Sequence, residues 1–218
     1  MKKRKIKKLK YDNIVLSSLV ALLIVLIIIT GVLVISLIKN TLVGTTANGI
    51  KILDTMDKHG YDLTENHTNY FKSLYYDLKE LLEKKEINDE EYAVLVAKLF
   101  VTDFYDLNSK LNKTDVGGEQ FVYFAYRESF KNYASDSTGI YYYVENNIYG
   151  DRKQKLPIIE KVEEINTEIF EYSYEKLLDS NAYKIDLFIT YKENLGYPEH
   201  VSVILVHVGD KIEVVEMN

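Results

Sequence analysis

Residues 19–29 read Leu-Val-Ala-Leu-Leu-Ile-Val-Leu-Ile-Ile-Ile, at the centre of a stretch without charged side chains that spans residues 14–38. An α-helix rises about 1.5 Å per residue, so a helix of this length reaches roughly 38 Å and can cross a hydrocarbon layer of about 30 Å. The apolar region of a cleaved signal peptide is shorter, at roughly 7–15 residues. The stretch therefore predicts an uncleaved signal anchor, with one transmembrane helix over residues 14–38.

The charges that flank this stretch predict its orientation. Basic residues near a transmembrane helix stay on the cytoplasmic side, and the cations before residue 14 face only one anion, Asp12. We therefore expect a single-pass protein of the cell membrane, with a basic cytoplasmic tail over residues 1–13 and an extracytoplasmic body after residue 38. The topology-determining residues are Lys2, Lys3, Arg4, Lys5, Lys7, Lys8 and Lys10.

The composition of the body excludes several classes of function. The whole chain has a net charge of −6, and residues 1–12 carry seven cations and one anion, so the remaining residues carry −12. This acidic body lacks the basic face that nucleic acid phosphates require. The chain contains no cysteine, so an exported domain must rely on its own core rather than on disulfides. Its richness in Lys, Ile, Asn and Tyr indicates an AT-rich, bacterial genome.

Residues 39–87 are predicted to form a juxtamembrane spacer and then an amphipathic helix. In the spacer, Ile50, Leu53 and Met56 have the spacing of a short helix. The amphipathic stripe packs either onto the core of its own chain or against a second copy, and it is too short for a sustained coiled coil. Its apolar residues recur at three- and four-residue steps: Tyr70, Phe71, Leu74, Tyr75, Leu78, Leu81 and Leu82.

Residues 88–111 carry the clearest helix signal. Asn88 is a favourable N-cap, and Glu91 completes a capping box with it. Ile87 and Tyr92 occupy the two positions of a hydrophobic staple. Apolar residues then fill both the three- and the four-residue steps, which predicts the most buried helix of the chain.

Residues 119–149 are rich in aromatic side chains and are predicted to contain two short helices, over residues 127–134 and 140–146. The aromatic residues form either a platform for a carbohydrate or another ligand, or ordinary packing with the ring buried and the hydroxyl in water. They are Phe121, Tyr123, Phe124, Tyr126, Phe130, Tyr133, Tyr141, Tyr142, Tyr143 and Tyr149.

After Gly150 the apolar period changes from 3.6 residues to 2, which predicts strands. The apolar face switches near Ile169 and Phe170, which indicates a β-bulge. Residues 177–181 are predicted to be a loop, and residues 183–191 alternate as a strand. Residues 201–208 and 211–217 are predicted to form a hairpin with Gly209 and Asp210 as its two-residue loop.

This order of elements indicates the α+β class. The predicted fold is an N-terminal transmembrane helix followed by amphipathic helices packed on a bent, four-stranded antiparallel sheet. The extracytoplasmic α+β domain is expected over residues 88–218.

Few residues of the body carry a chemical signal. Asp103 and Asp106 lie three residues apart on the buried helix and either supply a carboxylate to a cavity or face solvent. His207 lies in a strand, where it is either a satisfied sheet residue or a base. With Tyr123 and Tyr126 from the aromatic segment, Asp103 and His207 are the candidate ligand-binding residues. No catalytic motif and no metal-ligand spacing is present, so we expect no metal site and no cofactor.

The capped helix of residues 89–111, the short helices within residues 121–146 and the strands within residues 162–217 resemble the cone-shaped fold of the nuclear transport factor 2-like superfamily. One branch of that superfamily is enzymatic and similar to ketosteroid isomerases. The layout of a short tail, one span and an outer domain is similar to a second branch, the assembly factors of type IV secretion and of Gram-positive conjugation. By resemblance, this implies a cone-like scaffold that oligomerises and contacts envelope proteins.

Three hypotheses of function follow. The first is a membrane-anchored extracytoplasmic scaffold of the cell envelope, whose partners are the membrane, envelope proteins and other copies of itself. The second is a cone that binds a small ligand or acts as an isomerase. The third is a sensor ectodomain, which would need a separate output partner because the cytoplasmic tail is short.

Overall fold

The computed structural model describes residues 49–175 and 177–218. No helix among these residues is long and apolar enough to cross a membrane. The predicted fold class, with its transmembrane helix, is therefore wrong for this part of the chain. The predicted helix itself, at residues 14–38, lies outside the described residues, as do the basic tail and the cations from Lys2 to Lys10. The expected localisation stays a prediction.

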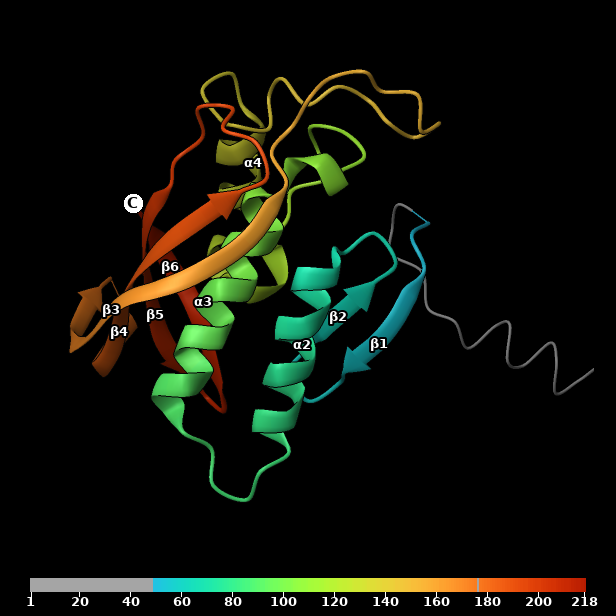
Figure 1. Ribbon diagram of the computed structural model, residues 1–218. Helices are drawn as coiled ribbons and strands as arrows, with labels where there is room; N and C mark the ends of the chain where they lie inside the picture. Colours follow the sequence, from blue (N-terminus) through green and yellow to red (C-terminus); the bar gives the residue numbers. More distant parts are fainter. Residues whose placement is uncertain (1–48, 176) are drawn as a thin grey trace, which may run out of the picture. The chain divides into compact units, whose positions relative to one another are not determined.

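Residues 52–218 form one compact unit, in which a four-stranded sheet packs against helices (Figure 1). Short 3-10 turns cover residues 107–109, 119–121 and 124–126. The helices and strands are β1 (Ile52–Met56), β2 (Tyr61–Thr64), α2 (Asn69–Leu82), α3 (Asp89–Tyr105), α4 (Arg127–Ser135), β3 (Ile159–Tyr174), β4 (Leu177–Tyr191), β5 (His200–Val208) and β6 (Lys211–Met217).

The four-stranded antiparallel sheet confirms that part of the prediction. Its strand order is β3-β4-β5-β6, and each strand pairs with the next along the chain. Gly209 and Asp210 join β5 to β6 as expected. The register of β3 shifts between Phe170 and Tyr172, close to the predicted bulge. The predicted loop over residues 177–181 is wrong, because residues 177–179 pair with the end of β3 and β4 already begins at Leu177.

A hairpin of β1 and β2 replaces the short helix predicted through Ile50, Leu53 and Met56. Those three residues have helical spacing, but Tyr61 and Leu63 further along alternate as buried positions of a strand. Gly60, with φ of +66°, allows the tight turn between the two strands. Strand pairing therefore overrides the local spacing.

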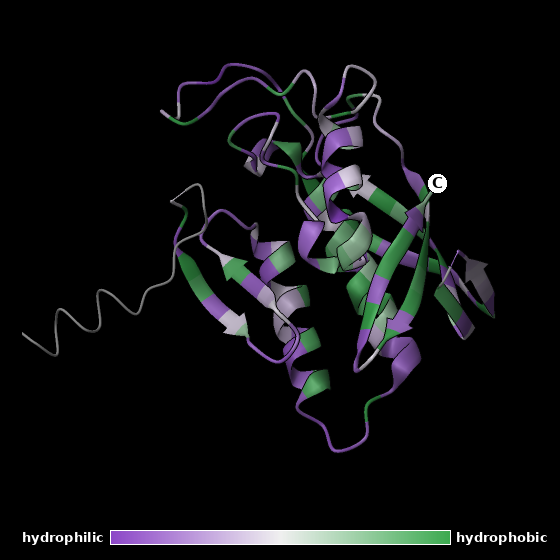
Figure 2. Cartoon of the chain, turned by 180° about the vertical axis from the view of Figure 1, so that it is seen from behind, coloured by the Kyte–Doolittle hydropathy of each residue, from purple (hydrophilic) through white to green (hydrophobic). Residues whose placement is uncertain are grey.

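Helix α2 begins where Thr68 accepts a hydrogen bond from the N–H of Phe71, at 3.2 Å. Hydrophobic and hydrophilic residues alternate along it (Figure 2). Its apolar stripe is buried against its own chain, which agrees with the first of the two sequence alternatives. The apolar stripe of α2 is part of the same hydrophobic core as residues 88–218. Buried residues of β1 and β2 belong to this core as well. Buried residues of α2 are Phe71, Leu74, Tyr75, Leu78 and Leu81.

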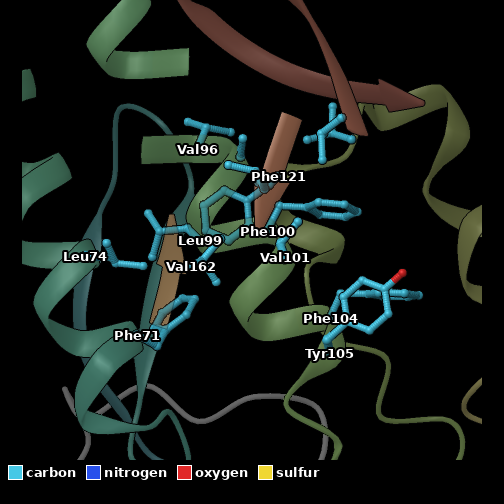
Figure 3. Packing of buried hydrophobic residues seen from close by; sticks show 14 of the residues in the cluster. Phe71, Leu74, Val96, Leu99, Phe100, Val101, Phe104, Tyr105, Phe121 and Val162 are labelled. Carbon is cyan, nitrogen blue, oxygen red and sulfur yellow. The ribbon is translucent and has the colours of Figure 1, made fainter. Parts of the chain in front are cut away.

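Helix α3 lies at the centre of the domain and contacts α2 and all four strands of the main sheet. Asn88 caps it by accepting from the N–H of Glu91, at 3.0 Å, as predicted. Twelve of its seventeen residues are buried, and Figure 3 shows its side chains packed against Phe71, Leu74 and Phe121. The helix ends at Tyr105 rather than near residue 111, because Asp106 has a ψ of 69° and leaves the helical conformation.

The second short helix predicted in the aromatic segment, over residues 140–146, is also wrong. Helix α4 is present as expected, but residues 140–143 form turns and residues 144–147 have no regular structure. The chain turns back on α4 at Gly139, where an added Cβ would lie 2.1 Å from the carbonyl oxygen of Ala134. Tyr141 is then fully buried, and its hydroxyl donates to the carbonyl of Phe104 at 2.7 Å.

The packing of α2 gives a first prediction. Leu78 is fully buried whereas Tyr76, on the other side of the helix, is 52% exposed. We expect Leu78→Ala to lower the free energy of unfolding by about 2–5 kcal/mol through the cavity it leaves. The matched Tyr76→Ala should change it by about 0.5 kcal/mol or less. Urea unfolding of both variants measures this, and equal effects would mean that α2 is not part of the core.

Candidate functional site

An open cleft of about 750 Å³ lies where α3, α4 and the end of β6 meet. Phe100 and Phe104 of α3 and Phe130 of α4 form its inner wall. Their rings lie 5.3–5.9 Å apart between centroids. This aromatic packing fixes α4 against α3 and leaves an apolar surface that faces the cleft.

The outer wall comes from the far end of the β3–β4 hairpin. Because β3 is bent by its bulges, Tyr172 and Tyr174 reach β6, although β4 and β5 separate β3 from β6 in the sheet. The hydroxyl of Tyr172 donates to Glu216 at 2.9 Å. The ring of Tyr174 lies 6.4 Å from the ring of Tyr126, edge to face. The cleft is therefore walled by residues that lie far apart in the sequence.

The hairpin end is held on the sheet by a second polar contact, which involves the candidate residue His207. Asp179 accepts from the backbone N–H of His207 at 2.7 Å and lies 2.8 Å from its Nδ1 atom. Burial raises the pKa of Asp179, but the hydrogen bonds from His207 and Asn181 outweigh it and hold the pKa below its usual range. His207 thus has a partner in the sheet and lies outside the residues that line the cleft.

The structure brings together two of the four candidate residues. Tyr123 and Tyr126 are in edge-to-face contact at 5.1 Å, and Tyr126 lines the cleft. The N–H of Tyr123 donates to the carbonyl of Val214 in β6 at 2.8 Å. Burial and the nearby carboxylate of Glu175 raise the pKa of Tyr126. The aromatic segment therefore supplies one edge of the cleft.

The candidate Asp103 is buried in a cluster of charged groups and does not line the cleft. Its carboxylate pairs with Lys110 and accepts from the N–H of Gly118 at 2.6 Å. The Nε2 atom of His67 lies 3.6 Å away. Burial by itself raises the pKa of Asp103, but Lys110 and His67 outweigh it and hold the pKa well below its usual range. The alternative that this side chain faces solvent is wrong.

Asp106 is also buried, with 2% of its surface exposed. Burial raises its pKa to about 6, although Lys110 acts in the opposite direction. The backbone N–H groups of Ser109 and Ile159 lie close enough to lower this pKa, but neither carboxyl oxygen has a hydrogen bond of normal geometry. The carboxyl group of Asp106 therefore loses its proton at a higher pH than an exposed aspartate does.

Within the described residues, Asp103 and His207 lie apart from the contact between Tyr123 and Tyr126. Asp103 and its partners fill the interior, and none of them lines the cleft. Among the described residues, no group of three His, Cys, Asp or Glu side chains is placed to hold a metal ion. The sequence indicates Asp103 as a candidate but does not indicate Lys110 or His67 as its partners. The contacts of Asp103 with these two residues depend on the path of loops, which local sequence patterns do not encode.

Comparison with models of protein families, with curated proteins and with solved structures found no match for this chain. The expected resemblance to the nuclear transport factor 2-like superfamily and to secretion assembly factors therefore stays a prediction. The function of the cleft and of the buried charged cluster is therefore inferred from the residues that form them.

Asp106 gives a prediction for the pH dependence of stability. Its pKa is about 6 in the folded protein and 3.8 ordinarily, so the folded state binds the proton more tightly, and stability falls as pH rises from about 4 to about 6. Asp106→Asn removes this loss. The stability of the variant relative to the wild type should therefore rise by up to about 3 kcal/mol between pH 4 and pH 7.

Urea unfolding across this pH range measures the difference between the two proteins. Asp103, with its lowered pKa, contributes stability that is lost only as pH falls below about 4. That loss lies below the pH range of the comparison, so it does not change the expected difference between pH 4 and pH 7. A difference that stays constant with pH would contradict the buried position of Asp106.

Proposed function

We propose that residues 52–218 form an interaction domain that binds an apolar segment of a partner protein in the aromatic cleft. The observation that carries this proposal is the cleft itself, with aromatic side chains from α3, α4 and the β3–β4 hairpin around the end of β6. This agrees with the first sequence hypothesis. The envelope location and the envelope partners of that hypothesis stay predictions.

The composition of the cleft supports a binding role. Its volume of about 750 Å³ falls within the roughly 300–1,000 Å³ that ligand pockets occupy. Tyr133 and Tyr174 on its rim are 74% and 53% exposed. Exposed aromatic side chains in a concave site are typical of surfaces that bind proteins, since a rigid ring buries a large area at little cost in conformational entropy.

The main chain at the cleft favours an extended peptide as the occupant. Strand β6 is at the edge of its sheet, and its residues 214–217, with Asn218, line the cleft. Within this run, Val214 already forms a parallel bridge with Val122, which also lines the cleft. An extended segment that adds beside β6 would use main-chain hydrogen bonds for affinity and the aromatic walls for side-chain recognition.

A small apolar molecule is the second candidate occupant, and the volume and apolar walls of the cleft favour it. It corresponds to the second sequence hypothesis. The two candidates differ in what they need: a small molecule needs only the walls, whereas a peptide also needs the edge of β6.

Peptide selection tests the proposal. We expect a phage-displayed peptide library, screened on the full-length protein, to yield extended peptides with aromatic or aliphatic residues. Tyr133→Ser should weaken the selected peptides by about tenfold or more, because aromatic anchors dominate such interfaces. Tyr76→Ser, which removes an exposed tyrosine from α2, away from the cleft, should leave binding unchanged.

Selection of no such peptide, or equal loss in both variants, would contradict the proposal. Binding of an apolar fluorophore that depends on Tyr133, without any peptide binding, would favour the small-molecule alternative instead.

A further inference from the structure

A second apolar feature lies on residues 142–155, which connect Tyr141 to the segment that leads into β3. We call these residues the arm. Tyr143, Ile148 and Tyr149 of the arm are 71%, 58% and 89% exposed. In both views the arm extends to the side of the molecule opposite the end of β6 (Figures 1 and 2). Its tip therefore points away from the cleft of its own chain.

The arm is fixed by hydrogen bonds rather than left as a loose loop. Gln154 joins its two limbs, because its side chain accepts from the N–H of Glu145 at 3.0 Å and donates to the carbonyl of Tyr143 at 2.8 Å. Arg152 anchors its base by donating to the carbonyls of Asn108 and Lys110 at 2.7 and 2.9 Å.

This ordering matters for binding. A segment that becomes ordered only on association loses conformational entropy in the binding step, which weakens the binding. A segment that is already ordered in the folded protein loses little more when it binds. Tyrosines on such a segment are the side chains most often found at the energetic centres of interfaces. The arm therefore presents Tyr143, Ile148 and Tyr149 in a form that suits insertion into a concave apolar site.

The charges of the arm and the cleft are complementary. Residues 144–155 carry three cations and two anions, in a body that is otherwise strongly acidic. Lys153 is exposed four residues from Tyr149. Among the residues that line the cleft, Glu216 is the charged one, and it is exposed. Lys155 is paired with Glu193 of its own chain at 2.8 Å, so Lys153 is the exposed cation that the arm can offer, and contact between arm and cleft places it near Glu216.

We propose that the arm of one copy of this chain inserts into the aromatic cleft of a second copy. The inference rests on the proposed function, since it names the occupant of the same cleft. Each copy contributes its arm to one neighbour and its cleft to another, so the contact is head to tail. Such contacts close into rings or continue as filaments, depending on the rotation between neighbours.

The cysteine-free sequence allows a direct test. Asp151→Cys places a single thiol on the arm, and Thr138→Cys places one on the rim of the cleft. Both side chains are exposed and neither is an aromatic anchor of the contact, so neither change should affect folding or the contact itself. We expect a short bismaleimide to join the two full-length variants when they are mixed, and to join neither variant to itself. Tyr76→Cys, mixed with each of the others, is the control for contacts made elsewhere.

The outcomes separate the possible arrangements. A crosslink in the arm–cleft mixture that exceeds all controls supports the inference, and its loss on Ile148→Ser would tie it to the apolar tip. Crosslinking of the arm variant to itself, or of no mixture above the Tyr76 control, overturns it. Peptide binding that depends on Tyr133 would then still support the proposed function, because it does not require a second copy.

Discussion

The burial of α3 on nearly all sides is the constraint on which the rest of the structure depends. A helix that is apolar around its whole circumference is stable only when other elements cover it. The hairpin β1–β2 and α2 cover one side, the sheet covers another, and the aromatic segment with α4 covers the end near Tyr105. Phe100 and Phe104 are buried as well, and they form the floor of the aromatic cleft.

The carboxylate of Asp103 fixes how the chain leaves α3. It holds Lys110 and the N–H of Gly118, which lie on either side of the turn that follows the helix. The approach is so close that an added Cβ at Gly117 would lie 2.1 Å from the carbonyl oxygen of Asp103. Since a buried ion pair gains little net stability against its desolvation, we attribute to this cluster the path of the loop rather than a large share of the folding energy.

The sequence predicted those elements whose signals are local. The Asn88 cap and the turn at Gly209 depend on a few adjacent residues, and both were found where expected. The β1–β2 hairpin is not predicted by the sequence, because the helical spacing of Ile50, Leu53 and Met56 is a local pattern, whereas β1 forms by pairing with β2.

The candidate site was harder to predict because its walls come from distant segments. Tyr126 was recognised as a candidate, but Tyr172 and Tyr174 join it only through the bend of β3. Asp103 was recognised by position alone, while its environment depends on His67 and Lys110 from two separate loops. Contacts between residues that lie far apart in the sequence produce no periodic pattern from which they could be predicted.

Strand β3 has a consequence for the behaviour of the protein at high concentration. An edge strand of sixteen residues offers a template on which other chains can add and form amyloid-like aggregates. Three register shifts interrupt its pairing, and exposed glutamates such as Glu163 and Glu168 recur along it. Irregular geometry and repeated charge of one sign oppose the stacking of identical strands. The longest edge of the sheet is thereby protected against aggregation, and the shorter edge at β6 is partly covered by the parallel bridge between Val122 and Val214.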